Sequence, residues 1–176
     1  SLAIIVIPEN VTSLRKSAFG FCGALRTIDI PARVSSIGPS AFEQSGLTSV
    51  TIPDGIAIIA FGVFQGCGGL KTVTIPKSVT KIGENAFTGT GTHPNDAPSF
   101  LDVYYGGSQT DWKKIDIDKS GGSNIPLQNA TIRFNHSPKI TVTFDTKGST
   151  VSKPADPTRT GFTFGGWFRE SACTPP

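Results

Sequence analysis

Apolar residues recur along the first half of the chain at a fixed spacing. An Ile-Pro pair recurs at Pro8, Pro31, Pro53 and Pro76, and these successive prolines are 23, 22 and 23 residues apart. Apolar residues stand three and six positions after each proline, and an Ala-Phe or Val-Phe pair stands at ten and eleven. The phenylalanines of these pairs are Phe19, Phe42, Phe64 and Phe87. A period of this length predicts a solenoid, in which each repeat is one coil that stacks on its neighbours.

Each coil contains a run of alternating apolar residues that predicts a short β-strand. The run has the form Leu-x-x-(Ile/Val)-x-Ile at 25–30, 47–52 and 70–75, and the proline that follows ends the strand ladder. Weaker copies of the run occur at 100–105 and 127–132. Together with the opening run of the first coil, they predict a sheet of six short parallel strands.

The segment that contains the phenylalanine differs from the strand. Its Ser-Ala-Phe or Asn-Ala-Phe step predicts one helical turn that directs the ring inward, with Ser17, Ser40 and Asn85 placed to cap it. In a later coil, Trp112 stands at the position of an inward isoleucine, which indicates a core that changes shape toward that end. A single coil cannot be stable alone, because its apolar burial does not offset the cost of ordering its backbone.

The pattern divides the chain into two parts. Residues 1–136 are predicted to form the solenoid, and residues 137–176 a separate segment in which the repeat is lost. The predicted repeats lie near 1–24, 25–46, 47–69, 70–99, 100–126 and 127–136.

The repeat resembles the BspA-like (Treponema pallidum-type) leucine-rich repeat, whose unit reads Leu-x-x-Ile-x-Ile-Pro, Val-x-x-Ile-Gly, Ala-Phe, Cys. The run from Leu25 to Pro31 and its copies carry this resemblance, together with Gly38, Gly83 and the Ala-Phe pairs. The resemblance implies an α/β fold, a leucine-rich-repeat solenoid with a parallel concave sheet of about six short strands. It also implies a bacterial surface protein whose partners are host matrix or other bacteria.

A second resemblance begins near Ile140. The segment from Lys153 to Phe168 is similar to the B repeat of internalins and of many gut-bacterial surface proteins, a small β-grasp-like module. The middle strand expected between Val151 and Lys153 is missing. We therefore expect residues 137–176 to be a truncated β-grasp-like segment that packs on the end of the solenoid or is poorly ordered, because so short a segment without a staple rarely folds alone.

Charge and length exclude several classes of partner. Sixteen Lys and Arg against thirteen Asp and Glu leave a net charge of +3, which is too small and too scattered to indicate a nucleic-acid or anionic-membrane partner. No apolar run is long enough to span a membrane. The chain has no Met and opens at Ser1, and we expect it to be a piece of a longer precursor.

The cysteines are predicted to be free. Cys22 and Cys67 occupy equivalent positions two coils apart, which at about 4.8 Å per rung separates their Cα atoms by about 10 Å. A disulfide requires a separation under about 7 Å, so both residues are predicted to be buried thiols. Cys173 stands alone near the end of the sequence.

Neither a metal site nor a catalytic site is predicted. His93 and His136 have no Cys or carboxylate at ligand spacing. The segment from Asp116 to Gly121 copies the first half of a calcium loop, but position twelve is Leu127 instead of Glu, which favours an ordinary turn after a strand. No acid, base and nucleophile set recurs in the sequence, so we expect a protein without cofactors that is not an enzyme.

The outward strand positions are the most informative candidates for function. Two and four positions before each proline, the sequence predicts a ladder rich in small hydroxyls: Thr27, Asp29, Ser49, Thr51, Thr72, Thr74, Asp102 and Tyr104. The ladder is predicted to continue at Asn129 and Thr131. Such hydroxyls can satisfy one another across strands, which would make this an ordinary sheet surface. The same face could bind a protein or glycan, with Tyr104 as an aromatic anchor.

Two functions follow from this face. The first hypothesis is a monomeric recognition or adhesion module, extracellular or on the cell surface of a gut bacterium, that binds a protein or glycan of a host or bacterial surface. The alternative is a structural spacer that presents another domain of a longer surface protein.

Overall fold

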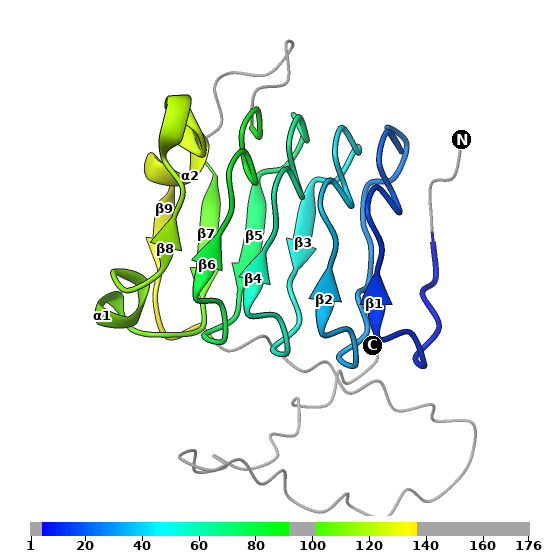
Figure 1. Cartoon of the computed structure of the whole chain (residues 1–176), viewed down its shortest axis with the longest axis horizontal. Coiled ribbons are helices and arrows are strands. Elements are labelled where there is room, and N and C mark those ends of the chain that lie inside the picture. Colours follow the sequence, from blue (N-terminus) through cyan, green and yellow to red (C-terminus); the bar gives the residue numbers. More distant parts are fainter. Residues whose placement is uncertain (1–4, 92–100, 137–176) are drawn as a thin grey trace, which may run out of the picture. The chain divides into compact units, whose positions relative to one another are not determined.

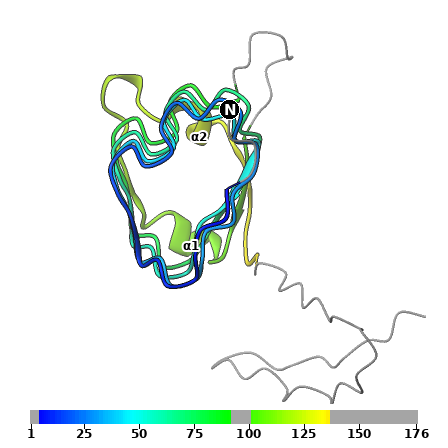
Figure 2. The same cartoon turned by 90° about the vertical axis from the view of Figure 1, so that its right-hand side faces the viewer.

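The computed structural model describes residues 5–91 and 101–136. The chain divides into two units, residues 1–139 and 140–176. The predicted segment 137–176, Cys173 and His93 therefore lie outside the described residues. Within the described residues, successive coils stack side by side as a solenoid (Figure 1). Viewed along the stack, the coils follow nearly one outline, with the strands on two of its sides (Figure 2).

One side of the coils forms a parallel sheet, which we call the long-strand sheet. Its order is β3-β5-β7-β9. The strands are β3 (Ser49–Thr51), β5 (Thr72–Ile75), β7 (Asp102–Tyr105) and β9 (Thr131–Arg133). The alternation of residue types explains the register, because Val50, Val73 and Val103 are opposite one another and buried. The predicted strands of the first two coils are reduced to a single bridge between Val6 and Asp29.

A second side of the coils carries shorter parallel strands, which the sequence analysis did not predict. They are β1 (Ser13–Leu14), β2 (Ser36–Ile37), β4 (Ile58–Ile59), β6 (Lys81–Ile82) and β8 (Asp116–Ile117). They pair as β1-β2 and as β4-β6-β8, and we call them together the short-strand sheet. The apolar position six residues after each proline lies here and points inward. Two-residue strands have too little alternation for a sequence pattern to reveal them.

The third side, which we call the turn side, contains the phenylalanines, and within residues 5–91 it forms turns instead of a helix. Ser17, Ser40 and Asn85 have φ angles of 54°, 56° and 57°, and Gly62 occupies the equivalent position at 61°. The prediction that the two serines and Asn85 cap a helical turn is therefore wrong, because a capping residue has an extended backbone and these are left-handed. Asn and Gly tolerate this conformation best, whereas serine adopts it less readily.

The predicted file of aromatic rings is confirmed. Ring centroids are 5.4 Å apart between Phe19 and Phe42, 5.6 Å between Phe42 and Phe64, and 5.3 Å between Phe64 and Phe87. The last three rings are fully buried, and one continuous core cluster contains them together with the inward residues of both sheets. Stacking between coils therefore supplies the core that no single coil has.

The end of the solenoid departs from the repeat. Two short helices, α1 (Gln109–Trp112) and α2 (Ile125–Gln128), and a 3-10 turn, η1 (Ser120–Gly122), occur there. Ile117, not Trp112, is opposite Ile82, so the predicted position of Trp112 is wrong. The reason is that α1 inserts a turn, and Trp112 instead packs edge-on against Tyr105 with ring centroids 5.1 Å apart.

The last predicted strand is also placed differently. Leu127 lies in α2, which begins with Pro126 in its first turn, and the strand starts only at Thr131. The N–H groups in the first turn of a helix have no acceptor within the helix, so a proline there, which has no N–H, loses nothing. Pro126 therefore favours the start of a helix at this point. As a result, Thr131 is opposite Asp102 and Arg133 is opposite Tyr104, a shift of two residues from the predicted register.

No helix in the described ranges is long and apolar enough to cross a membrane.

Candidate binding face

The outward side chains of the long-strand sheet form two straight rows. One row runs Ser49, Thr72, Asp102 and Thr131, and the other runs Thr51, Thr74, Tyr104 and Arg133. Thr27 and Asp29 are exposed on the coil before β3. The structure thus places the predicted candidates from β3, β5 and β7 together on one face, which we call the sheet face.

The end of each row differs from the prediction. Asn129 was expected beside Asp102, but it ends α2 and lies outside the sheet. Arg133 was not among the candidates, and the structure places it next to Tyr104. Recognition of Pro126 as the start of a helix would have moved the expected strand forward and included Arg133.

The hydroxyls of the sheet face do not satisfy one another. Among the described residues, no hydrogen bond involves the side chains of Thr27, Ser49, Thr51, Thr72 or Thr74. The expectation of cross-strand hydroxyl bonding is therefore not met by this geometry. These groups face outward with their donors and acceptors available to solvent or to a partner.

Charged and aromatic groups gather at one end of the sheet face, in what we call the end cluster: Asp102, Tyr104, Arg133 and His136. Arg133 Nη2 lies 3.6 Å from Asp102 Oδ1, and its guanidinium carbon lies 5.7 Å from the centre of the Tyr104 ring. The rings of Tyr104 and His136 are 4.6 Å apart at their centroids, with an interplanar angle of 52°. Because Arg133 and Asp102 are both substantially exposed, their ion pair contributes little to stability, about 0–1 kcal/mol.

The opposite end of the sheet face is hollowed. A depression of about 430 Å³ lies on the first three coils and is lined by Val6, Thr27, Asp29 and Thr51, among others. The Val6 side chain is 84% exposed. This residue was not a sequence candidate, although it stands two positions before Pro8, in the same outward column as Asp29 and Thr51.

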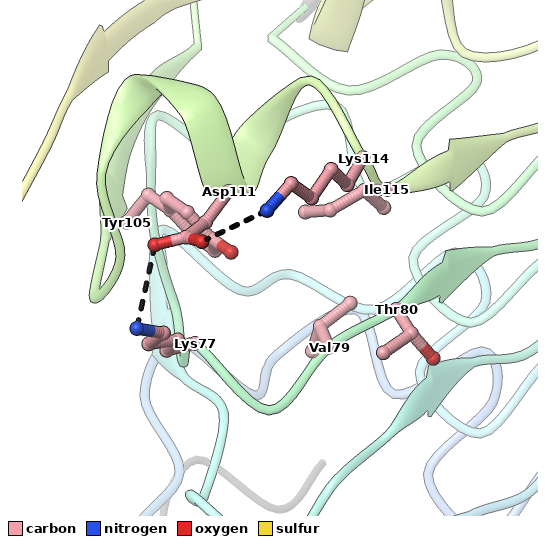
Figure 3. Close-up of a pocket in the computed structure, with 7 residues that line it drawn as sticks. All are labelled: Lys77, Val79, Thr80, Tyr105, Asp111, Lys114 and Ile115. Atoms are coloured by element: carbon pink, nitrogen blue, oxygen red, sulfur yellow. Dashed lines mark ion pairs between the residues drawn. The ribbon is translucent and has the colours of Figure 1, made fainter.

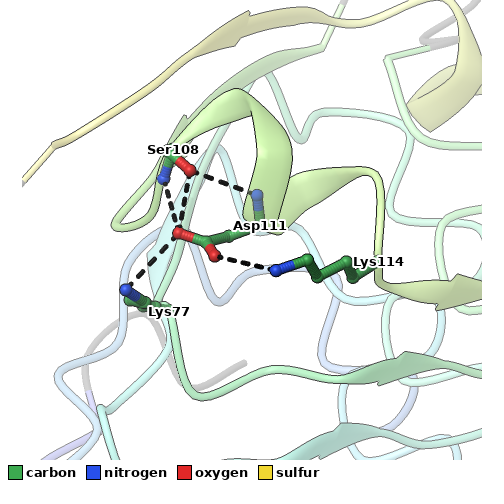
Figure 4. Close-up of polar contacts among 4 residues, drawn as sticks. All are labelled: Lys77, Ser108, Asp111 and Lys114. Carbon is green, nitrogen blue, oxygen red and sulfur yellow. Dashed lines mark hydrogen bonds and ion pairs between the residues drawn. The ribbon is translucent and has the colours of Figure 1, made fainter.

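A second hollow lies under α1 and is a candidate for chemistry. Its volume is about 150 Å³, and Lys77, Tyr105, Asp111 and Lys114 line it (Figure 3). Asp111 accepts hydrogen bonds from the Ser108 N–H at 3.1 Å and from the Ser108 hydroxyl at 2.9 Å. It also forms ion pairs with Lys77 at 3.4 Å and Lys114 at 3.9 Å (Figure 4). The ion pair with Lys77 ties α1 to the preceding coil.

Two groups that line this hollow, Asp111 and Tyr105, have shifted pKa values. The hydrogen bonds from Ser108 hold the pKa of Asp111 below its ordinary value, and Lys77 adds to this effect. Burial raises the pKa of Tyr105, and the Asp111 carboxylate raises it further. Neither group changes its charge near neutral pH, so neither is suited to general acid–base catalysis there.

The two cysteines among the described residues are packed in the solenoid as free thiols. Cys67 is buried and donates to the Phe42 carbonyl at 2.9 Å, and burial raises the pKa of its thiol. Cys22 and Cys67 are both free, and Cys22 is only partly buried.

The segment that resembles half of a calcium loop pairs its carboxylates with other groups of the protein. Asp116 pairs with Lys81 at 3.3 Å, and Asp118 accepts from the Ser120 N–H at 2.9 Å. Within residues 5–91 and 101–136, no three His, Cys, Asp or Glu side chains are grouped to hold a metal ion.

Comparisons with known proteins match both parts of the sequence. Residues 1–99 match the family model of the BspA type leucine rich repeat region, in six copies. Residues 131–176 match the model of the Listeria-Bacteroides repeat domain. The boundary between the two parts at residues 136 and 137 stays a prediction. A comparison with curated proteins returned no match.

Two solved structures are similar. One is a leucine rich cell surface protein from Faecalibacterium prausnitzii A2-165, with 29% identity and a TM-score of 0.47, over 66% of this chain and 35% of that protein. The other is a leucine-rich repeat protein from Bacteroides ovatus ATCC 8483, with 21% identity and a TM-score of 0.38, over 66% of this chain and 45% of that protein. The chain thus spans less than half the length of either solved protein.

Proposed function

The chain belongs to the family of BspA-type leucine-rich repeats, and from this premise we propose that it is a recognition module that binds a protein or glycan through the sheet face. The module is displayed on the bacterial cell surface or secreted, as the family resemblance implies. It acts as a monomer and without catalysis.

One observation carries this proposal: a row of side-chain hydroxyls on paired strands, none of them engaged with another group of the described residues. Thr51 and Thr74 lie directly opposite each other in the register. The strands that carry them are fixed by a buried core, so binding would not require the backbone to become ordered. A preorganised polar face of this kind keeps more of its interaction energy when it binds.

The end cluster supplies the groups that such a face needs for affinity. Tyr and Arg are the residue types most enriched among those that dominate binding energy. Tyr104 and Arg133 are adjacent and partly exposed, and the available hydroxyls of Thr74 and Thr131 lie beside them. The proposed contact surface therefore has an aromatic and cationic centre with a polar surround.

The proposal is tested by a binding screen with two matched variants. The wild-type chain is applied to immobilised glycans and to a panel of extracellular-matrix proteins, and each partner found is measured again with both variants. The first variant removes groups from the sheet face: Thr51→Ala, Thr74→Ala and Tyr104→Ala. The second removes outward groups from the short-strand sheet, where Ser13, Ser36 and Lys81 are exposed. It carries Ser13→Ala, Ser36→Ala and Lys81→Ala.

The expected result is at least roughly tenfold weaker binding by the sheet-face variant and unchanged binding by the control variant. Circular dichroism and thermal unfolding establish that both variants are folded. Equal binding by wild type and the sheet-face variant would refute the proposal. Failure to bind any partner would favour the alternative, a structural spacer that presents another domain.

A further inference from the structure

The turn sides of successive coils are joined by one repeated backbone hydrogen bond. The N–H of the phenylalanine in each coil donates to a carbonyl of the next coil. The distances are 2.7 Å from Phe19 to Ala41, 2.9 Å from Phe42 to Val63, and 2.9 Å from Phe64 to Ala86. The last coil of the series contains Phe87, and no turn of the same kind follows it in the described residues.

A parallel series runs two residues earlier. Ser17 N–H donates to the Pro39 carbonyl at 3.0 Å, Ser40 N–H to the Phe61 carbonyl at 2.9 Å, and Gly62 N–H to the Glu84 carbonyl at 3.0 Å. The equivalent donor in the last coil is the Asn85 N–H. A third series runs two residues later, from the Phe21, Gln44 and Gly66 N–H groups to the next coil. The equivalent donors of the last coil are therefore the N–H groups of Asn85, Phe87 and Gly89, and the acceptors of Asn85 and Phe87 come from a later segment of the chain.

Two side chains supply these acceptors. Phe87 N–H donates to Asn124 Oδ1 at 2.8 Å, and Asn85 N–H donates to Ser123 Oγ at 2.6 Å. Both distances lie close to those of the backbone series. The two residues come from the turn just before α2, which packs beside the last coil (Figure 1).

Every polar group of Asn124, in both its side chain and its backbone, forms a hydrogen bond. Its side-chain amide donates to the Gly83 carbonyl at 3.0 Å and to the Asp118 carbonyl at 2.8 Å. Its backbone N–H donates to the Thr88 hydroxyl at 3.2 Å, and its carbonyl accepts from Leu127 N–H at 3.0 Å. The residue is completely buried and has a left-handed backbone, with φ of 56°.

We propose that Ser123 and Asn124 form a side-chain cap that replaces the next coil and ends the solenoid on its turn side. The cap goes beyond the proposed binding function and does not depend on it. Its physical role is to pair two donors that the stacking pattern would otherwise leave buried or half-buried without an acceptor. A buried N–H without an acceptor is costly, and native structures rarely contain one.

The test is a crossed pair of variants read by amide hydrogen exchange. Asn124→Gly removes the side-chain amide but keeps a residue that accepts the left-handed backbone. Ser123→Ala removes only the hydroxyl. We expect Asn124→Gly to accelerate exchange mainly at the Phe87 amide, and Ser123→Ala mainly at the Asn85 amide, each by about tenfold. The equivalent amides Phe42 and Ser40, inside the stack, serve as internal references.

Asn129→Ala is the matched control, because Asn129 is exposed and lies in the same segment. It is expected to leave both amides unchanged. The proposal is overturned if Phe87 and Asn85 exchange at wild-type rates in the two variants, or if the two variants accelerate all four amides equally. If Asn124→Gly does not fold, Ser123→Ala alone tests the proposal. The ratio of the Asn85 exchange rate to the Phe87 exchange rate is then expected to rise above its wild-type value, and an unchanged ratio would overturn the proposal.

Discussion

Residues 5–91 and residues 101–136 build the same solenoid by different means. In the first region one pattern is repeated, and each coil offers the next the same ring, the same two sheets and the same turn-side donors. In the second region the long-strand sheet continues through β7 and β9 and the short-strand sheet continues through β8, but the connections between the strands are rebuilt with α1, η1 and α2.

The two regions differ in the hydrogen-bond partners of their backbone N–H and carbonyl groups. A coil in the middle of the stack has a partner above and below, so backbone groups pair with backbone groups. The coil that contains Phe87 has no further repeat beside it on the turn side, and the side chains of Ser123 and Asn124 supply the acceptors that a next coil would supply. Within the stack, any coil that follows the repeat pattern can pair with its neighbours. The end of the stack instead requires specific residues at specific positions.

The largest effect is expected in the repeated region at the aromatic file. Phe64→Ala removes a fully buried ring between Phe42 and Phe87 and should cost about 3–5 kcal/mol of unfolding free energy. Urea denaturation measures this change. Phe61→Ala is the control, since Phe61 is 45% exposed and belongs to the same coil. Comparable losses in the two variants would mean that the file does not form the core.

A backbone contact between coils should give the next largest effect. A Cβ at Gly46 would collide with the carbonyl oxygen of Gly23, whereas a Cβ at Gly23 itself would meet nothing within 4 Å. Gly46→Ala should therefore destabilise the chain by about 1–3 kcal/mol, and Gly23→Ala by much less. Thermal unfolding of the two variants under one condition makes the comparison. A Gly23→Ala variant as unstable as Gly46→Ala would show that coil spacing is not what the glycine protects.

In the terminal region, the expected effect of a single residue is smaller and local. Ser108 caps α1 and accepts from the Asp111 N–H at 3.2 Å, so Ser108→Ala should cost about 1 kcal/mol. Gln109→Ala, at the first residue of the same helix, serves as the control. Chemical denaturation gives both values, and equal stability of the two variants would argue against the cap.

The smallest effect is expected from the charge of Asp111, and it depends on pH. Because its folded pKa is lowered from the ordinary value of 3.8, the ionised carboxylate stabilises the fold above that value. This stabilisation is lost as pH falls through the lower folded pKa. Asp111→Asn should therefore lower the melting temperature slightly at pH 7, and the difference from wild type should disappear in acid. A difference that stays constant from pH 7 to pH 2 would contradict this account.

The sequence by itself determined the period, the inward columns and the outward ladder. These features follow from a repeated apolar spacing, and stacking then places equivalent residues in line without further information. Thus Phe19 to Phe87 could be predicted to form one file, and Ser49, Thr51, Thr72 and Thr74 to share one face. The left-handed turns could not be predicted, because serine, glycine and asparagine occupy the same position in different coils.

Only the tertiary structure decided how the solenoid ends. The partners of Asn85 and Phe87 come from residues about forty positions later in the chain, at Ser123 and Asn124, and no local pattern indicates such a distant pairing. The position of Arg133 beside Tyr104 likewise depends on where α2 stops and β9 begins. A periodic sequence specifies neighbours by repetition, but a unique end is specified by contacts that exist only once the chain has folded back on its last coil.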